Sequence, residues 1–372
     1  MRSSSTDRLN RSGAKRSRGG AAMPRGLAGL GFAAALGGLC AALAVSIVLA
    51  VTLGPADISP VTAWRIGFHQ LWPDLASADW PAAHERIVWH IRLPRALLAM
   101  LVGATLAVVG TVLQAMVRNP LADPTILGGT SGAAAGAVSV IVLGWGFAGI
   151  YTLSVAAFAG GLIGYGLAFL LAHSAGGLSP LRLVLAGIAV SYLFAALTSM
   201  LIFISEQSQT ARIALFWMLG ALGGARWDQL GLPTILLAAG LIYLLAQARP
   251  LNLLLFGDET ATSMGVPPDR LRRILFVVVA LLTGTSVALA GGVGFVGLVI
   301  PHAARMVVGS DHRRVLPLAT LVGALFLLWS DVLARLVIQP RELPIGVITS
   351  LVGAPVFALL LRSRLRGSDH AR

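Results

Sequence analysis

Apolar runs of about twenty residues recur along the whole chain, and this repetition limits the fold more than any other feature. A helix needs about twenty apolar residues to cross the hydrocarbon core of a bilayer. Only 12% of the 372 residues are charged, whereas soluble domains average about 25%. The sequence therefore predicts an all-α, polytopic membrane protein with about ten spans. Their expected bounds are 26–54, 96–117, 126–144, 150–172, 183–204, 230–247, 274–293, 294–308, 315–338 and 343–361.

The segments outside these runs define the expected organisation of the chain. Residues 1–25 are rich in Ser and Arg and predict a disordered basic cytoplasmic tail. A transmembrane domain is expected over residues 26–361. Within it, residues 55–92 are expected to form an external segment and residues 248–273 a cytoplasmic one. Residues 362–372 are expected to form a second cytoplasmic tail.

The distribution of Lys and Arg indicates which ends face the cytoplasm, because these residues gather in cytoplasmic loops. With both termini inside, twenty of the 28 Lys and Arg residues fall on the inner side and eight on the outer side. This arrangement explains the net charge of +13 as a topology signal that faces anionic lipid headgroups. It removes the need for a nucleic-acid partner.

Two similar segments indicate an inverted repeat. Gly103–Gly110 resembles Gly284–Gly291, and a proline follows each segment, Pro120 and Pro301. The two segments lie in the second and seventh predicted spans, which run in opposite directions, and inverted repeats are common in transporters. Chance similarity between spans rich in Gly and Ala is the alternative. Pro301 also lies in the short eighth run, where we expect a broken or partial span.

Residues 256–273, FGDETATSMGVPPDRLRR, form a polar segment between two apolar runs. Asp258 predicts a helix N-cap and Gly265 a helix end, so a helix of under two turns is expected between them. Such a short helix is unstable alone in water and needs a partner surface or its own spans. Ala261 and Met264 fall on one face and are expected to form a docking knob. An ordinary solvated loop is the alternative.

No motif in the sequence predicts catalysis. A P-loop needs Gly-Lys-Ser/Thr, and the only lysine, Lys15, follows Ala14. The spans lack the carboxylate chains expected of an ion-coupled carrier. Asp331 is the main exception, and we expect it to pair with Arg335 one helical turn away. His302 is expected to be a hydrogen-bonded packing residue. A stand-alone secondary carrier, or a membrane enzyme with catalytic His302 and Asp331, remains as an alternative.

The order of several short motifs resembles the membrane permeases of ABC importers for iron chelates and vitamin B12, the FecCD type. The resemblance extends from about residue 92 to the C-terminus, and residues 1–91 match only as a basic tail, a span and a variable external segment. The segments that carry it are Arg92–Arg95, Gln114 with Arg118–Pro124, Gly129–Gly132, Leu185–Ile188, Phe216–Gly220, Leu251–Gly265, Gly294–His302 with Arg305, Asp311–Arg313, Glu342–Gly346 and Gly353–Pro355.

This resemblance implies a type II ABC importer permease fold and a homodimer with the pathway along its axis. Two cytoplasmic ATPase subunits would bind ATP and Mg²⁺, and a periplasmic binding protein would deliver the cargo. The chain itself is then expected to be a transport subunit with no cofactor and no enzyme activity. It would lie in a bacterial inner membrane with both termini cytoplasmic. The expected cargo is an iron chelate, a ferric siderophore or haem, with vitamin B12 as the alternative.

The resemblance also implies roles for three sets of residues. Six match the coupling helix that rests on the ATPase: Asp258, Glu259, Ala261, Thr262, Met264 and Gly265. Three match a loop of the inner gate, where Leu121 can supply an apolar plug: Asn119, Pro120 and Leu121. Three match outer arginines that contact acidic residues of the binding protein, with lipid-headgroup anchoring as the alternative: Arg92, Arg95 and Arg335. A second gate segment is expected near residues 174–179.

Overall fold

The structure, a computed structural model, describes residues 25–54, 56, 58–72, 79–174 and 178–369. Within these ranges every regular element is a helix, seven helices are long and apolar enough to cross a membrane, and three shorter apolar helices accompany them. These helices follow the ten predicted spans in order, which confirms the all-α polytopic fold. The predicted tail over residues 1–25 lies almost wholly outside the described residues.

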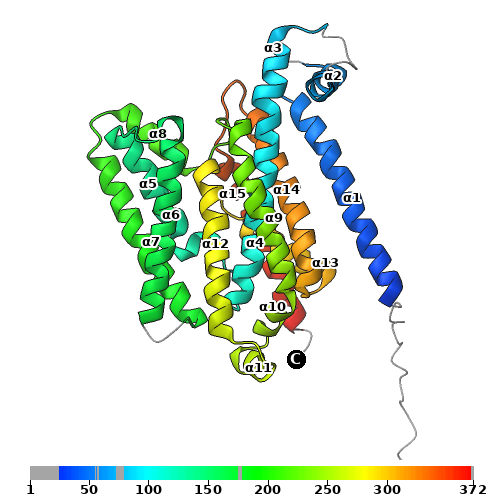
Figure 1. Ribbon diagram of the computed structural model, residues 1–372, viewed down its shortest axis with the longest axis vertical. Coiled ribbons are helices and arrows are strands. Elements are labelled where there is room, and N and C mark those ends of the chain that lie inside the picture. Colours follow the sequence, from blue (N-terminus) through cyan, green and yellow to red (C-terminus); the bar gives the residue numbers. More distant parts are fainter. Residues whose placement is uncertain (1–24, 55, 57, 73–78, 175–177, 370–372) are drawn as a thin grey trace, which may run out of the picture.

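The apolar helices are α1 (Arg25–Thr52), the continuous helix of α3, η2 and α4 (Ala82–Met116), α5 (Gly129–Leu143), α6 (Thr152–Ser174), α7 (Pro180–Phe203), α9 (Gly231–Ala246), α12 (Pro268–Ala290), α13 (Val296–Val308), α14 (His312–Leu336) and α15 (Ile345–Asp369). Shorter helices connect them: α2 (Pro60–Leu71), α8 (Ser208–Met218), α10 (Ala248–Leu254) and α11 (Asp258–Ser263). Figure 1 shows α2 and α3 at one end of the bundle and α11 at the other, and we call these the α2 end and the α11 end.

Helix α4 is the central helix of the bundle, and most of its residues are buried. A Cβ atom on Gly103 would overlap the carbonyl oxygen of Gly323 in α14, and one on Gly110 would overlap that of Gly297 in α13. Small residues at these crossings let the helix backbones touch, which is how helices associate in a membrane. Helix α4 therefore fixes the positions of both α13 and α14, which it contacts backbone to backbone.

Helices α5 and α6 pack through the glycine stripes that the sequence contains. A Cβ on Gly132 would overlap the carbonyl oxygen of Gly160, and one on Gly164 would overlap that of Gly128. The stripes therefore serve close helix packing.

The eighth span is a short, partial one, as expected, since α13 has 13 residues, but Pro301 lies inside this helix without breaking it. The non-helical backbone lies before α13, in the break that separates it from α12. Gly291 (φ 70°) and Phe295 (φ 68°) adopt left-handed backbone conformations there. The last carbonyl of α12 has a partner inside the protein, because the Ala221 amide donates to the Ala290 carbonyl at 2.9 Å. Non-helical backbone at membrane depth requires such internal partners.

Two helices extend beyond the predicted edges of their spans. The second span is expected from residue 96, but the helix that contains it already begins at Ala82, and the external position of residues 55–92 stays a prediction. The charged first turns of this helix are held by side chains, since Glu85 accepts hydrogen bonds from Gln70 at 2.5 Å and from Trp80 at 3.3 Å. At the other terminus α15 continues to Asp369, beyond the predicted end at residue 361. The inverted repeat stays a prediction.

Candidate functional site

The polar segment forms the short helix α11 at one end of the bundle (Figure 1). The helix ends as predicted at Gly265 (φ 82°), whose amide donates to the Thr262 carbonyl at 2.9 Å, while the Val266 amide donates to the Ala261 carbonyl at 2.9 Å. This pair of bonds is a Schellman motif. The predicted N-cap is wrong, because Gly257 (φ 108°) occupies the cap position and Asp258 is the first helical residue.

The two faces of α11 differ in exposure. Ala261 is fully buried in the core beneath the helix, so its predicted part in an exposed docking knob is wrong. The reason is that α11 uses this small residue to pack on its own spans. Met264 is 56% exposed and Phe256 is 74% exposed. Glu259, Thr262 and Gly265 are exposed as well, so the remaining predicted coupling residues form an accessible surface.

Asp258 lies at the junction of α11 with two other elements. Arg272 of α12 donates to both carboxylate oxygens, at 2.8 and 2.6 Å, and Arg118 lies 3.9 Å away. Hydrogen bonds from Arg272 lower the pKa of Asp258, and the charges of Arg272 and Arg118 act in the same direction against the effect of burial. We call Arg118, Arg272 and Asp258 the α11 cluster. Arg272 lies in the same predicted cytoplasmic segment, but nothing in its local sequence marks it as a site residue.

The predicted gate residues form a tight turn directly after α4. Arg118 has a left-handed backbone (φ 51°), and the Asn119 side chain accepts a hydrogen bond from the Leu121 amide at 2.9 Å. Helix α4 therefore ends at Met116, just before the Asn-Pro pair. Leu121 is 43% exposed and is available as an apolar contact. Its role in a gate stays a prediction, and the second predicted gate segment lies partly outside the described residues.

The three predicted docking arginines are buried at the α2 end, where Arg95 and Arg335 form ion pairs and Arg92 lies beside them. We call this group the α1-cap cluster, and its members are Arg92, Arg95, Asp331, Arg335 and Glu342. Arg95 contacts Asp331 at 2.9 Å and Glu342 at 2.8 Å, and Arg335 contacts Asp331 at 3.2 Å, which confirms the predicted pair. The cluster joins α4 to α14 and to the loop before α15.

Two of these arginines also cap the end of α1. Arg92 donates to the carbonyls of Val51 and Thr52, both at 2.9 Å, and Arg335 donates to that of Ala50 at 3.1 Å. The last carbonyls of a helix lack partners within the helix and attract cations. The arginines therefore have internal partners in this structure, and their contact with a binding protein stays a prediction.

Two further polar groups near the α11 end were not recognised as site residues. The Gln114 side chain of α4 donates to the carbonyls of Gly297 and Leu298, both at 3.2 Å, and accepts a hydrogen bond from Arg305 of α13. Asn252 of α10 donates to Asp311 at 2.8 Å. These residues lie inside the motifs that carry the resemblance, but their partners are far away in the sequence.

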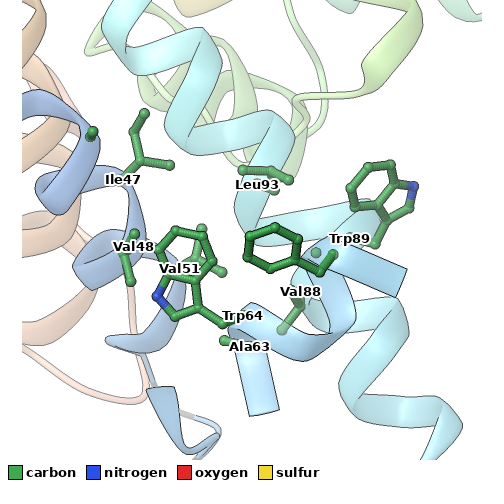
Figure 2. Close-up of a pocket in the computed structure, with 11 residues that line it drawn as sticks. Ile47, Val48, Val51, Ala63, Trp64, Val88, Trp89 and Leu93 are labelled. Atoms are coloured by element: carbon green, nitrogen blue, oxygen red, sulfur yellow. The ribbon is translucent and has the colours of Figure 1, made fainter. Parts of the chain in front are cut away.

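An apolar pocket of about 300 Å³ lies between α1, α2 and the helix that leads into α4. Figure 2 shows Trp64 of α2 facing Val48 and Val51 of α1, with Val88 and Leu93 nearby. The residues that line the pocket are apolar or glycine, so it offers no charged group to a cofactor.

Comparisons with known proteins agree with this architecture. The model of the FecCD transport family matches residues 42–363. The cobalamin import system permease protein BtuC of Halobacterium salinarum is 44% identical over 286 residues, which cover 76% of this chain and 75% of that protein. The vitamin B12 import system permease protein BtuC of Citrobacter koseri is 44% identical over 292 residues, which cover 78% and 88%.

A solved structure gives the same result. An inward-facing metal-chelate type ABC transporter superimposes with a TM-score of 0.77 at 32% identity, and the match covers 88% of this chain and 99% of that one. The family match extends over most of the chain and through both charged clusters. This protein is therefore an ABC importer permease of the FecCD transport family.

Proposed function

We propose that the cargo of this permease is cobalamin. The observation that carries the proposal is the 44% identity to permeases named for cobalamin and vitamin B12 import, over three quarters or more of their length. This favours vitamin B12, the alternative cargo, over the iron chelate that we expect from the sequence. An iron chelate remains the second candidate, since the metal-chelate type transporter is 32% identical.

The energy source in this proposal is a cytoplasmic ATPase that grips α11. The exposed residues Glu259, Thr262 and Met264 supply the contact, and the surplus of Lys and Arg assigns the α11 end to the cytoplasm. Both termini are then cytoplasmic, and a binding protein docks at the α2 end. A tag inserted after Gly265 should be reached only after cells are permeabilised, and labelling of intact cells would overturn this orientation.

A second copy of the chain completes the pathway in this proposal. Helix α7 carries large apolar side chains with high exposure, including Tyr192 at 75% and Phe203 at 89%. Exposed apolar surface of this kind can face lipid or another helix. We infer that part of it faces the partner of a homodimer, with the turn at Leu121 forming part of the inner gate.

The cargo is tested by reconstituting the permease with its ATPase and binding protein in proteoliposomes. We expect ATP-dependent accumulation of cobalamin and little accumulation of haem or a ferric siderophore. If ATP drives uptake of an iron chelate and not of cobalamin, the iron chelate is the cargo and the proposal of cobalamin is wrong. Uptake that needs no ATPase subunit and collapses with the ion gradient would identify a secondary carrier instead.

The docking surface is tested by the double substitution Glu259→Arg with Met264→Asp. Truncation of interface hot spots costs roughly 2 kcal/mol or more each, so binding of the ATPase should weaken by more than about tenfold while the chain stays folded. Glu206→Arg, an exposed position at the α2 end, is the matched control. Transport at the wild-type rate in the double variant would refute the docking role.

A further inference from the structure

Arg272 joins three elements of the α11 end through one guanidinium group. Its side chain is fully buried. Two nitrogens donate to the carboxylate of Asp258, the first residue of α11, and Nε donates to the carbonyl of Met116, the last residue of α4, at 3.3 Å. Figure 1 shows α11 beneath the lower ends of α10 and α12. One side chain of α12 therefore holds both the start of α11 and the end of α4.

The chemistry of arginine makes this connection stiff. A guanidinium group is planar, and a bidentate pair with a carboxylate fixes its orientation as well as its distance. The carbonyl of Met116 belongs to the last turn of α4, where such groups lack a partner inside the helix. Arg272 thus caps α4 with the same rigid plane that binds α11.

The predicted gate follows this junction within a few residues. Arg118, whose side chain lies 3.9 Å from the same carboxylate, is the residue before Asn119. Asp258 is therefore close to the gate turn both through Arg272 and the α4 backbone and through Arg118 directly.

When α11 moves, the contacts of Arg272 with Asp258 and with the end of α4 can respond in two ways. Either α11 breaks the bonds between Asp258 and Arg272, which leaves a buried cation without its counter-charge, or it carries Arg272 and the end of α4 with it. Asp258 is 40% exposed but Arg272 is fully buried, and leaving a buried cation without its charged partner is unfavourable, so joint movement is the easier of the two.

We propose that Arg272 is a positioning residue that transmits movement of α11 to the turn at residues 117–122. This rests on the proposed function, in which an ATPase docks on α11. Arg272 itself touches neither cargo nor nucleotide in this mechanism. It determines whether the gate turn responds when the ATPase moves the helix.

The test compares hydrogen–deuterium exchange in the complete complex in nanodiscs, nucleotide-free and trapped with ATP and vanadate. Two peptides are followed, residues 117–122 and residues 258–265. In the wild type, we expect nucleotide trapping to change exchange in both. In Arg272→Gln, the α11 peptide should keep its response while the gate peptide loses its own.

A functional readout accompanies the exchange measurement. Residues that carry coupling between sites change it by about 0.5–2 kcal/mol, so the ATP hydrolysed per cargo transported should rise roughly 2- to 30-fold in Arg272→Gln. Arg272→Lys keeps the positive charge but cannot form the bidentate pair, so its ATP hydrolysed per cargo should lie between the values for the wild type and Arg272→Gln. Arg273→Gln, an exposed neighbour on α12, is the matched control and should behave as the wild type.

The outcomes are distinguishable. A normal response of the gate peptide in Arg272→Gln would overturn the proposal, and so would failure of Arg272→Gln, Arg272→Lys and Asp258→Asn alike to assemble, because Arg272 would then serve folding alone. If only Arg272→Gln fails to assemble, Asp258→Asn replaces it in the exchange measurement. Loss of the gate-peptide response with a normal α11-peptide response would then support the proposal, and a normal response of both peptides would overturn it. If the wild-type α11 peptide shows no response to nucleotide trapping, the proposed contact of the ATPase with α11 fails, and transmission fails with it.

Discussion

The α1-cap cluster and the α11 cluster use the same ion-pair chemistry at different depths. In the first, the side chains of Arg95, Asp331 and Arg335 are each less than a tenth exposed. In the second, Arg272 is fully buried, but the Asp258 side chain is 40% exposed. Water can reach one side of the second cluster and is excluded from the centre of the first. The α1-cap cluster is therefore suited to holding helices in place, and the α11 cluster to a junction that moves.

Asp331→Asn should have the largest effect, because it leaves two buried arginines without their shared carboxylate. Breaking a buried ion pair costs about 3–5 kcal/mol of folding stability. The thermal unfolding midpoint of the purified protein in detergent measures the loss. Asp79→Asn, which breaks an exposed pair with Arg65, is the control and should have little effect. Equal midpoints for the two variants would show that burial does not distinguish the α1-cap cluster.

Asp258→Asn should have a smaller effect on stability. Arg272 loses its charged acceptor but keeps the carbonyl of Met116 and an amide oxygen at residue 258. Hydrogen bonds to charged groups contribute about 1.5–3 kcal/mol, which is the expected loss in the same thermal unfolding measurement. Asp269→Asn, an exposed position in the first turn of α12, serves as control. A loss as large as that of Asp331→Asn would contradict the comparison.

The stability of the α11 cluster should depend on pH through the carboxyl group of Asp258. The pKa of Asp258 is lowered in the folded protein, mainly by the hydrogen bonds from Arg272. The stabilisation is therefore fully present above the ordinary aspartate pKa of 3.8 and is lost as the pH falls through the lower folded value. Below pH 3.8 the wild type and Asp258→Asn should converge in unfolding midpoint. A gap between them that persists to lower pH would contradict the assigned ionisation.

Much of the fold follows from the sequence because hydropathy alone identifies spans. The ten apolar runs, the glycine stripes of α5 and α6 and the short eighth span all have local signals. The start of the second span at Ala82 does not, since Glu85 and Arg86 lower the hydropathy of its first turns. The contacts that support this start include one from Glu85 to Gln70 of α2, fifteen residues earlier, and one to Trp80 just before the helix.

The candidate site was only partly predictable for the same reason. The end of α11 at Gly265 depends on local backbone preferences, so the sequence predicts it. The burial of Ala261 and the pairing of Arg272 with Asp258 depend on how α11 folds back on its own spans. The internal partners of Arg92 and Arg95 are likewise distant in sequence, and Arg95 pairs with residues more than two hundred positions away. Residue type identified these arginines, but only the fold gives their partners.

Glu342→Gln should have the smallest effect and sharpens the comparison within a single cluster. Its side chain is 42% exposed, although it binds the same arginine as Asp331 does. Exposed ion pairs contribute about 0–1 kcal/mol, and Arg95 keeps Asp331 when Glu342 is neutral. The unfolding midpoint should therefore shift far less than in Asp331→Asn, which serves as the internal reference. If the two variants were equally destabilised, the shared arginine rather than burial would determine the strength of the cluster, and the contrast with the α11 end would lose its physical basis.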